Sequence, residues 1–295
     1  MIYINNNKKL AISIIAISGL LYGCSSTKKV TPQQTLNEAN KLAETGLYAD
    51  AYAKYSSAIA QTAQWDSISS RLATISANAV KQDSSACVWG SKFSSKGDTQ
   101  KLRALNESLT RLGREEERAY LVMSDTTSFF NILGVQPVLE IKAKRLAEDK
   151  DSELVTVYDR LTNVNVQAEV FDSYFKMAQK TLSDKKLEKE SKAILKVVPS
   201  NKTALYYLGS QKYNSAESAY TRLMNDYNKN KTQAAYAYLT RDLKKTVTPL
   251  YKESKEYFEM LRKEEPENKT YIKYLININD RLSNSAEVKK LKKLL

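Results

Sequence analysis

The sequence of 295 residues contains 8 glycines, 5 prolines and no histidine, and its 46 Lys and Arg against 33 Asp and Glu give a net charge of +13. Without histidine, nucleophilic systems with a histidine base and metal sites with histidine ligands are excluded. The scarcity of glycine and proline argues against a sandwich or barrel, which needs many tight turns, and favours long helices with short connections. The length fits one or two domains or a single elongated solenoid.

The positive charge has two interpretations. A basic balance favours contact with an anionic membrane surface, a glycan or an acidic protein. The Lys and Arg residues are dispersed along the chain, which favours the second interpretation, solvated helix faces that bind nothing. The secretory pattern at the N-terminus argues against nucleic acid as a partner.

Residues 1–23 have the pattern of a secretory signal peptide. A polar start that ends in Lys8 and Lys9 precedes an apolar run from Leu10 to Leu21. That run has about a dozen residues, whereas a membrane-spanning helix needs about 20. We therefore expect a signal peptide here and not a permanent transmembrane anchor.

The tetrapeptide LYGC, which ends at Cys24, resembles the lipobox of bacterial lipoproteins, and only Tyr22 departs from the usual small or aliphatic residue. The resemblance implies a covalent lipid with acyl chains such as palmitate on Cys24, no other cofactor, and a tether over residues 24–34. Each buried methylene of such a lipid contributes about 0.8 kcal/mol, so the protein would be anchored to the membrane without crossing it. An ordinary signal peptide followed by a chance thiol is the alternative.

The residues after the cysteine bear on the location. In many Gram-negative lipoproteins an Asp at this point resembles a retention signal for the inner membrane, and Ser25 stands there instead. The following segment SSTKK lacks the acidic residues of surface-export signals. By resemblance, we expect the periplasmic face of the outer membrane.

Residues 35–65 carry the first repeat pattern, in LNEANKLAETGLYADAYAKYSSAIA. Small residues let two helices approach closely, a glycine makes the turn, and tyrosines fill the gaps: Ala39, Ala51, Ala58, Gly46, Tyr48 and Tyr55. The spacing resembles the tetratricopeptide repeat (TPR) family, which implies a helical hairpin. A hairpin unrelated to that family is the alternative.

Residues 66–198 keep helical periodicity but match the repeat poorly, and we interpret them as irregular helical hairpins. Ser, Gly and charged residues predict a loop near 81–100. Cys87 would be the only free thiol of a lipidated chain, so a disulfide or metal site lacks a second ligand and an inert thiol is favoured. Trp89 would either anchor the loop to the helices or face a partner.

Residues 199–295 contain the tripeptide Asn-Lys-Thr three times, at Asn201, Asn230 and Asn268. Pro199 and Pro266 are 67 residues apart, which is two units of roughly 34 residues, the TPR period. We expect each Asn to start the first helix of a repeat. The fold class is thus predicted as an all-α, TPR-like helix-turn-helix solenoid, regular at the C-terminal end and degenerate in the middle.

The longer interval after Asn230 predicts an extended helix from Thr232 to Val247 that ends at Thr248-Pro249, because proline breaks helices. The final segment VKKLKKLL is explained as the polar cap that a solenoid end needs, with a membrane-touching helix as the alternative.

The TPR resemblance implies a concave groove lined by fixed positions of each first helix. In this sequence those positions are Thr203, Tyr206, Ser210, Tyr213, Thr270, Lys273, Asn277 and, beside them, Arg281. Tyrosine offers rigid contact area with a polar end, which suits peptide or glycan contact. We expect Tyr207, Tyr257 and Tyr274 to pack in the core.

The leading hypothesis is a lipid-anchored envelope protein whose repeats form a scaffold for another envelope protein or complex. The alternative is a lipoprotein that binds the cell wall or a glycan. An enzyme is the third class, because a pair of carboxylates hydrolyses glycosides without histidine. Every Asp and Glu fits an ordinary helical charge pattern, so we expect no catalytic residue and no metal site.

Overall fold

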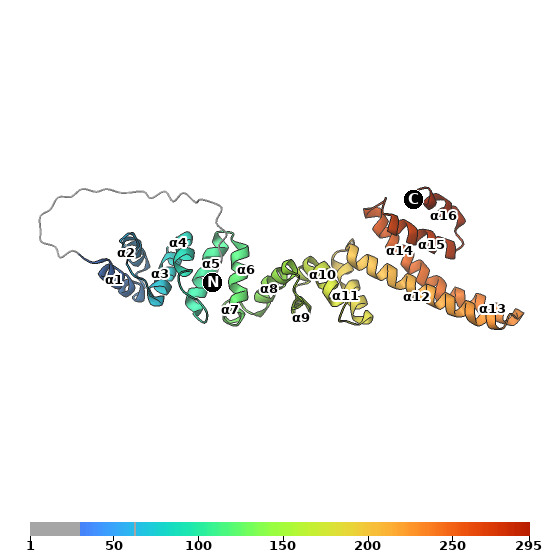
Figure 1. The fold of residues 1–295 in the computed structure, drawn as a ribbon, viewed down its shortest axis with the longest axis horizontal. Helices are drawn as coiled ribbons and strands as arrows, with labels where there is room; N and C mark the ends of the chain where they lie inside the picture. Colours follow the sequence, from blue (N-terminus) through green and yellow to red (C-terminus); the bar gives the residue numbers. More distant parts are fainter. Residues whose placement is uncertain (1–29, 62) are drawn as a thin grey trace.

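The structure of the protein, a computed structural model, describes residues 30–61 and 63–295. The predicted all-α, helix-turn-helix solenoid is confirmed: helices follow one another as antiparallel hairpins in an elongated array (Figure 1). The described residues contain no strand. Cys24 and the predicted signal peptide lie outside the described residues, so lipidation stays a prediction.

The N-terminal part is a stack in which neighbouring helices pack in chain order. Its helices are α1 (Pro32–Glu44), α2 (Tyr48–Ala60), α3 (Ser67–Ala79), α4 (Asp83–Gly90), α5 (Thr99–Arg111) and α6 (Glu115–Ser124). α1 and α2 form the hairpin expected between residues 35 and 65, and Gly46 turns the chain with φ +80°. Ala39, Ala51 and Ala58 are fully buried. These methyl-sized side chains let the helices approach closely.

The expected loop near 81–100 was wrong for Asp83–Gly90, which is helix α4. Trp89 is 6% exposed, and its ring centroid lies 5.3 Å from that of Tyr52 and 5.9 Å from that of Trp65. Burial of this ring against α2 outweighs the weak helix preference of the serines and glycine around it. Trp89 therefore anchors the segment to the helices.

The middle part consists of helices of unequal length: α7 (Thr126–Leu133), α8 (Val135–Asp149), α9 (Leu154–Tyr158), α10 (Val164–Ala178) and α11 (Asp184–Val197). One apolar cluster spans α8 to α11 and the start of α12. At its centre the rings of Tyr158 and Tyr174 stack with centroids 3.7 Å apart. This continuous core joins the N-terminal stack to the C-terminal hairpins.

The C-terminal part contains a long hairpin followed by a short one. Its elements are α12 (Lys202–Lys229), α13 (Gln233–Asp242), the π-helical turn η1 (Leu243–Val247), α14 (Thr248–Glu264), α15 (Lys269–Arg281) and α16 (Ser285–Lys292). α14 packs between α12 and α15, and α16 covers the far side of α15. α13 lies at the end of the molecule, away from α15 and α16 (Figure 1).

The second Asn-Lys-Thr copy does not start a repeat. Asn230 is the C-cap of α12, and the side chain of Thr232 caps α13 instead. α12 has 28 residues because no helix breaker interrupts it and α14 covers one of its faces along much of its length. Pro199 and Pro266 thus flank one elongated hairpin, and their spacing corresponds to one unit and not two.

The helix predicted to end at Thr248-Pro249 continues through that point, so this prediction was also wrong. The backbone widens into η1, where the amide of Thr248 donates to the carbonyl of Leu243. Proline lacks an N–H and its ring collides with the carbonyl four residues earlier in an α-helix. A π-helical turn alters the hydrogen-bond register just before Pro249, so the helical rod accommodates the proline without breaking.

Candidate functional site

Two of the three Asn-Lys-Thr copies start helices in equivalent places. The side chain of Asn201 accepts a hydrogen bond of 2.9 Å from the amide of Ala204, and Asn268 accepts one of 3.0 Å from Thr270. Such caps satisfy amides that have no partner within the helix. The ion pair between Lys202 and Glu265, 2.5 Å long, joins the start of α12 to the C-cap of α14, three residues before Asn268. α12 and α15 therefore begin side by side.

Tyrosines recur every seven residues along α12, at Tyr206, Tyr213, Tyr220 and Tyr227. Seven residues make about two helical turns, so these side chains share one face of the helix. The first three meet α14 or α15, whereas Tyr227 meets Tyr236 of α13. This seven-residue spacing is visible in the sequence, and it differs from the spacing of the predicted groove positions.

The rings interlock edge to face. The centroid of Tyr274 on α15 lies 5.1 Å from that of Tyr213 at an interplanar angle of 87°, and 6.2 Å from that of Tyr206 at 84°. On its other side Tyr274 stacks on Phe258 of α14 with centroids 4.2 Å apart. Such pairs contribute about 0.5–1.5 kcal/mol each beyond burial. The rings of α12 and α15 are thereby held in fixed orientations.

Glu217 joins the three helices at the far end of this surface. Its carboxylate accepts hydrogen bonds from Nε and Nη2 of Arg281 at 3.0 and 2.9 Å and from the hydroxyl of Tyr251 at 2.6 Å. The guanidinium of Arg281 also lies 4.1 Å from the ring centroid of Tyr220. One acidic residue thus ties α12 to α14 and α15, and sequence patterns gave no sign of its role.

The ionisation of these groups follows their surroundings. Burial raises the pKa of Glu217, but the hydrogen bonds and charge of Arg281, together with the bond from Tyr251, outweigh it and lower the pKa overall. Burial raises the pKa of Tyr274 to about 12. The surface therefore keeps the ion pair charged and Tyr274 neutral at physiological pH.

The structure brings four of the eight predicted groove residues together. Tyr206 and Tyr213 on α12 face Tyr274 on α15. Burial raises the pKa of Tyr213 overall, although Asn277 and Arg281 on α15 each lower it. Lys273, a fifth predicted residue, is exposed next to Tyr274 in the sequence. We call this set the tyrosine face: Tyr206, Tyr213, Lys273, Asn277 and Arg281.

The other three predicted residues lie elsewhere or at the margin. Ser210 donates to the carbonyl of Tyr206 at 2.7 Å and lines a different groove, on the α11 side of α12. Thr203 is half-buried, and Thr270 is exposed in the first turn of α15. The expected core residues Tyr207, Tyr257 and Tyr274 do pack against the apolar clusters.

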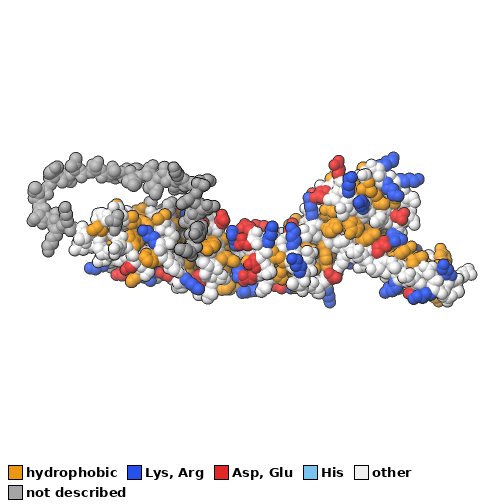
Figure 2. Space-filling view, in the orientation of Figure 1, with side chains coloured by type: hydrophobic (Ala, Val, Ile, Leu, Met, Phe, Trp, Pro, Cys, Tyr) orange, Lys and Arg blue, Asp and Glu red, His pale blue; other side chains and the backbone are white. Residues whose placement is uncertain are grey.

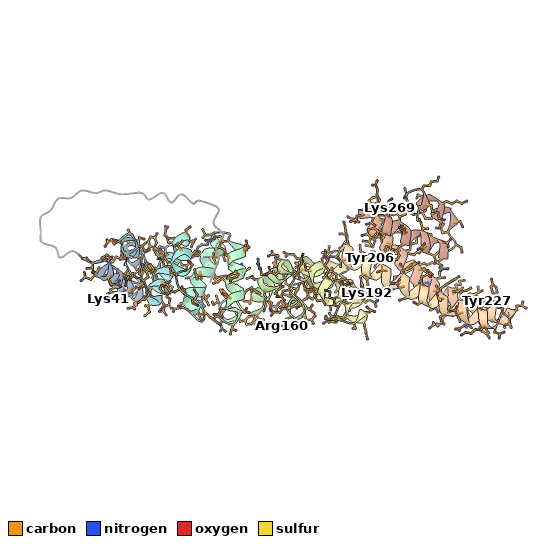
Figure 3. The ribbon with its side chains drawn as sticks, in the orientation of Figure 1. Lys41, Arg160, Lys192, Tyr206, Tyr227 and Lys269 are labelled. Atoms are coloured by element: carbon orange, nitrogen blue, oxygen red, sulfur yellow. The ribbon has the colours of Figure 1, made fainter. Side chains whose placement is uncertain are left out.

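The residues of the tyrosine face differ in how much of their side chain solvent can reach. Tyr206 is 39% exposed although its ring contacts Phe258, Tyr271 and Tyr274. Figure 3 shows Tyr206 at the junction of α12 with the α14–α16 bundle, with Lys192 and Lys269 on either side of it. A fixed and partly exposed aromatic ring can contact a protein surface with little loss of side-chain entropy.

A second groove lies between α11 and α12, with a volume of about 700 Å³. Its lining is mainly hydroxyl and amide side chains: Asp184, Tyr207, Ser210, Gln211, Asn214, Ser215, Ser218, Ala219 and Arg222. The hydroxyl of Tyr207 donates to the carbonyl of Asp184 at 3.2 Å, and Oε1 of Gln211 is buried without a hydrogen-bond partner among the described residues.

Two further observations limit the chemistry. Within residues 30–61 and 63–295, no group of three or more Asp, Glu or Cys side chains is arranged to hold a metal ion. None of the helices in that part of the chain combines the length and the apolar character that crossing a bilayer requires.

Comparison with known proteins gives structural similarity alone, since no family model and no curated protein matches the sequence. A TPR repeats protein from Bacteroides fragilis is similar at 15% identity with a TM-score of 0.31, over 85% of this chain and 99% of that one. The TPR domain of the protein p58(IPK) is similar at 14% identity with a TM-score of 0.26, over 90% of this chain and 83% of that one.

Proposed function

We propose that this chain is a lipid-anchored envelope protein that acts as a scaffold and holds another envelope protein or complex against the tyrosine face. The observation that carries the proposal is the set of fixed, partly exposed rings and cations on α12 and α15. Tyrosine and arginine are enriched among the residues that dominate protein interfaces. We propose no catalytic role and no cofactor apart from the lipid on Cys24.

The anchor rests on the lipobox resemblance at Cys24 and puts the scaffold on the periplasmic face of the outer membrane. Incorporation of labelled palmitate in cells, followed by density-gradient separation of the membranes, tests it. The native chain should carry label in the outer-membrane fraction, and Cys24→Ser should carry none. Label that persists in the Cys24→Ser chain would contradict the anchor.

The tyrosine face is tested by photo-crosslinking in cells. A photoreactive phenylalanine analogue replaces Tyr206, and the matched control replaces Tyr120, which is 59% exposed on α6. We expect a stoichiometric protein partner from position 206 and none from position 120. A partner captured equally at both positions, or at neither in a folded chain, would count against this surface.

A double substitution measures the contribution of the face. Tyr206→Ala with Lys273→Glu changes two exposed side chains, so we expect folding to be retained. A tyrosine that dominates an interface contributes about 2 kcal/mol or more, so recovery of the crosslinked partner in a pull-down should fall by roughly tenfold or more. Unchanged recovery would place the interface elsewhere.

A cell-wall or glycan ligand is the second candidate function, and the polar groove between α11 and α12 favours it. Hydroxyl and amide side chains around about 700 Å³ offer hydrogen bonds that suit a neutral sugar. Co-sedimentation with isolated cell wall tests this function. Asn214→Leu should reduce sedimentation, whereas the tyrosine-face double variant should not.

A further inference from the structure

The long hairpin carries its end beyond the rest of the molecule. We call residues 221–247 the hairpin tip; it comprises the last turns of α12, all of α13 and η1. α13 packs against α12 and η1, so the hairpin tip is two helices thick. Figure 3 shows Tyr227 at this end, far from Tyr206 and Lys269.

The hairpin tip is basic. It contains six Lys and Arg against two Asp, a net charge of +4. Both acidic residues are neutralised locally, because Asp226 pairs with Lys229 at 3.2 Å and Asp242 with Arg241 at 2.8 Å. Figure 2 shows blue and orange side chains over this end. The remaining cations make no ion pair among the described residues: Arg222, Lys231, Lys244 and Lys245.

One face of α13 combines an exposed ring with a guanidinium and leads to two of the unpaired lysines. Ala234, Tyr238 and Arg241 follow one another at spacings of four and three residues, so they share the face opposite the buried Leu239. Tyr238 is 59% exposed, and the guanidinium of Arg241 lies 5.0 Å from its ring centroid. The exposed Lys244 and Lys245 follow in the next turn.

We propose that the hairpin tip binds the surface of an anionic lipid bilayer through this face of α13. The attraction of a basic segment to anionic headgroups increases with each Lys or Arg near the surface, and it needs no complementary shape. Tyrosine is favoured at the level of the headgroups, where its ring is apolar and its hydroxyl is hydrated. Tyr238 supplies the ring on an exposed helix face, and the unpaired Lys244 and Lys245 in the next turn supply the charge.

An acidic protein is the competing partner, and the size of the face argues against it. α13 has 10 residues and is therefore roughly 15 Å long. A helix face of that length covers a few hundred Å² at most, whereas a stable protein interface buries about 800 Å² on each partner. A bilayer imposes no such minimum, because it presents negative charge wherever the hairpin tip touches it.

Vesicle co-sedimentation tests the proposal independently of the tyrosine face and of the lipid on Cys24. The chain used begins at Ser25, which removes the signal peptide and the lipidation site and retains every described helix. The probes are vesicles of phosphatidylcholine alone and vesicles of phosphatidylcholine with phosphatidylglycerol at a ratio of about three to one. We expect binding to the anionic vesicles, weakened at high salt because exposed charges are screened.

Matched variants locate the binding. Each Lys or Arg at an anionic surface strengthens binding about fivefold, so Arg241→Gln with Lys245→Gln should weaken it roughly 25-fold. The control Lys180→Gln with Lys185→Gln removes the same charge from exposed positions in the middle of the chain. Tyr238→Ala should weaken binding more than Tyr236→Ala, because Tyr236 is equally exposed but points to the other side of α13, toward Tyr227.

Three outcomes would overturn the proposal. The first is equal binding to both kinds of vesicle. The second is equal weakening by the hairpin-tip and control substitutions. The third is no vesicle binding by a chain that instead binds poly-glutamate through Arg241 and Lys245, which would assign the hairpin tip to an acidic protein.

Discussion

The N-terminal hairpin of α1 and α2 and the C-terminal hairpin of α12 to α14 follow the same helix-turn-helix plan but bury different side chains. Between α1 and α2 the contact is made by small residues such as Ala39, Ala51 and Ala58. Between α12 and α14 the small residues Gly209 and Ser254 also make a close contact, but the large rings of Tyr251 and Phe258 are buried beside it. The ring of Tyr206 packs on the edge of this aromatic cluster, 6.1 Å from Phe258, and reaches the surface.

Length is the second difference. α1 and α2 have 13 residues each, and they pack against each other and against α3. α12 has 28 residues, and its side-chain contacts with α15 lie between Tyr206 and Tyr220. A hairpin of the same length as its neighbours packs within the solenoid along that length. A longer hairpin has an end that no neighbouring hairpin covers.

The largest effect should come from the aromatic core of the C-terminal part. Phe258→Ala removes a fully buried ring that stacks on Tyr274. We expect a loss of about 3–5 kcal/mol in the free energy of unfolding, measured by chemical denaturation. Because each repeat contacts mainly its neighbours, hydrogen exchange should accelerate in α12 to α15 and stay unchanged in α1 to α3.

Uniform acceleration of hydrogen exchange over the whole chain would contradict this expectation. It would show that the N-terminal and C-terminal parts unfold as one unit.

A smaller loss should follow from filling the close contact between α12 and α14. A Cβ atom on Gly209 would lie 3.1 Å from the ring of Phe258 and 3.2 Å from Cβ of Tyr257. Ser254 also donates to the carbonyl of Gly209 at 2.8 Å, which holds the helices at this distance. We expect Gly209→Val to cost about 1–3 kcal/mol by chemical denaturation, because a packed contact resists extra volume.

The matched control is Ser218→Val, at an exposed position of the same helix, which should cost far less. Equal losses for both would mean that the close contact at Gly209 does not decide the effect, because helix propensity alone favours valine over glycine.

The ion pair of Glu217 should contribute less, and its contribution should depend on pH. Arg281→Gln leaves the carboxylate with one fewer charged donor, and we expect a loss of about 1–2 kcal/mol near neutral pH. The folded pKa of Glu217 lies below its usual value, so the stabilisation is present above that usual value and disappears as pH falls through the folded pKa. Denaturation at several pH values should therefore show a smaller difference between native and variant chains in acid.

The exposed Arg222→Gln is the control for the change of charge. A difference between native and Arg281→Gln chains that stays constant down to strongly acidic pH would rule out Glu217 as its source.

The fold class was predictable from the sequence because helix periodicity, scarce glycine and proline, and a repeated cap pattern all indicated one architecture. Asn201 and Asn268 were recognisable as helix starts, since the same capping side chain stands two residues after a proline. Asn230 carries the same tripeptide without a proline before it, and it ends a helix instead. The missing proline is a local difference, whereas the packing of α12 against α14, η1 and α13, which accompanies its length, is recorded in no local pattern.

The tyrosine face was predictable only in part, because local repeat positions identify some of its residues and long-range contacts decide the rest. Tyr206 and Tyr213 were identified from repeat positions, and the structure places them against α15. Glu217 was missed because its partners Tyr251 and Arg281 are 34 and 64 residues away in the sequence. Contacts between residues so far apart in the sequence depend on where the long hairpin turns back. The position of that turn depends in part on whether Pro249 can be accommodated within a continuous helix.

The smallest effect on stability should come from the hairpin tip. Tyr238 has 59% of its surface exposed, so Tyr238→Ala should change the free energy of unfolding by less than about 0.5 kcal/mol. Tyr206→Ala should cost more, because its ring contacts three others. A loss above about 1 kcal/mol for Tyr238→Ala would show that the ring packs within the hairpin. If stability is unchanged, Tyr238 is dispensable for folding, and weaker vesicle binding by Tyr238→Ala then reports the contact with the bilayer and not a loss of structure.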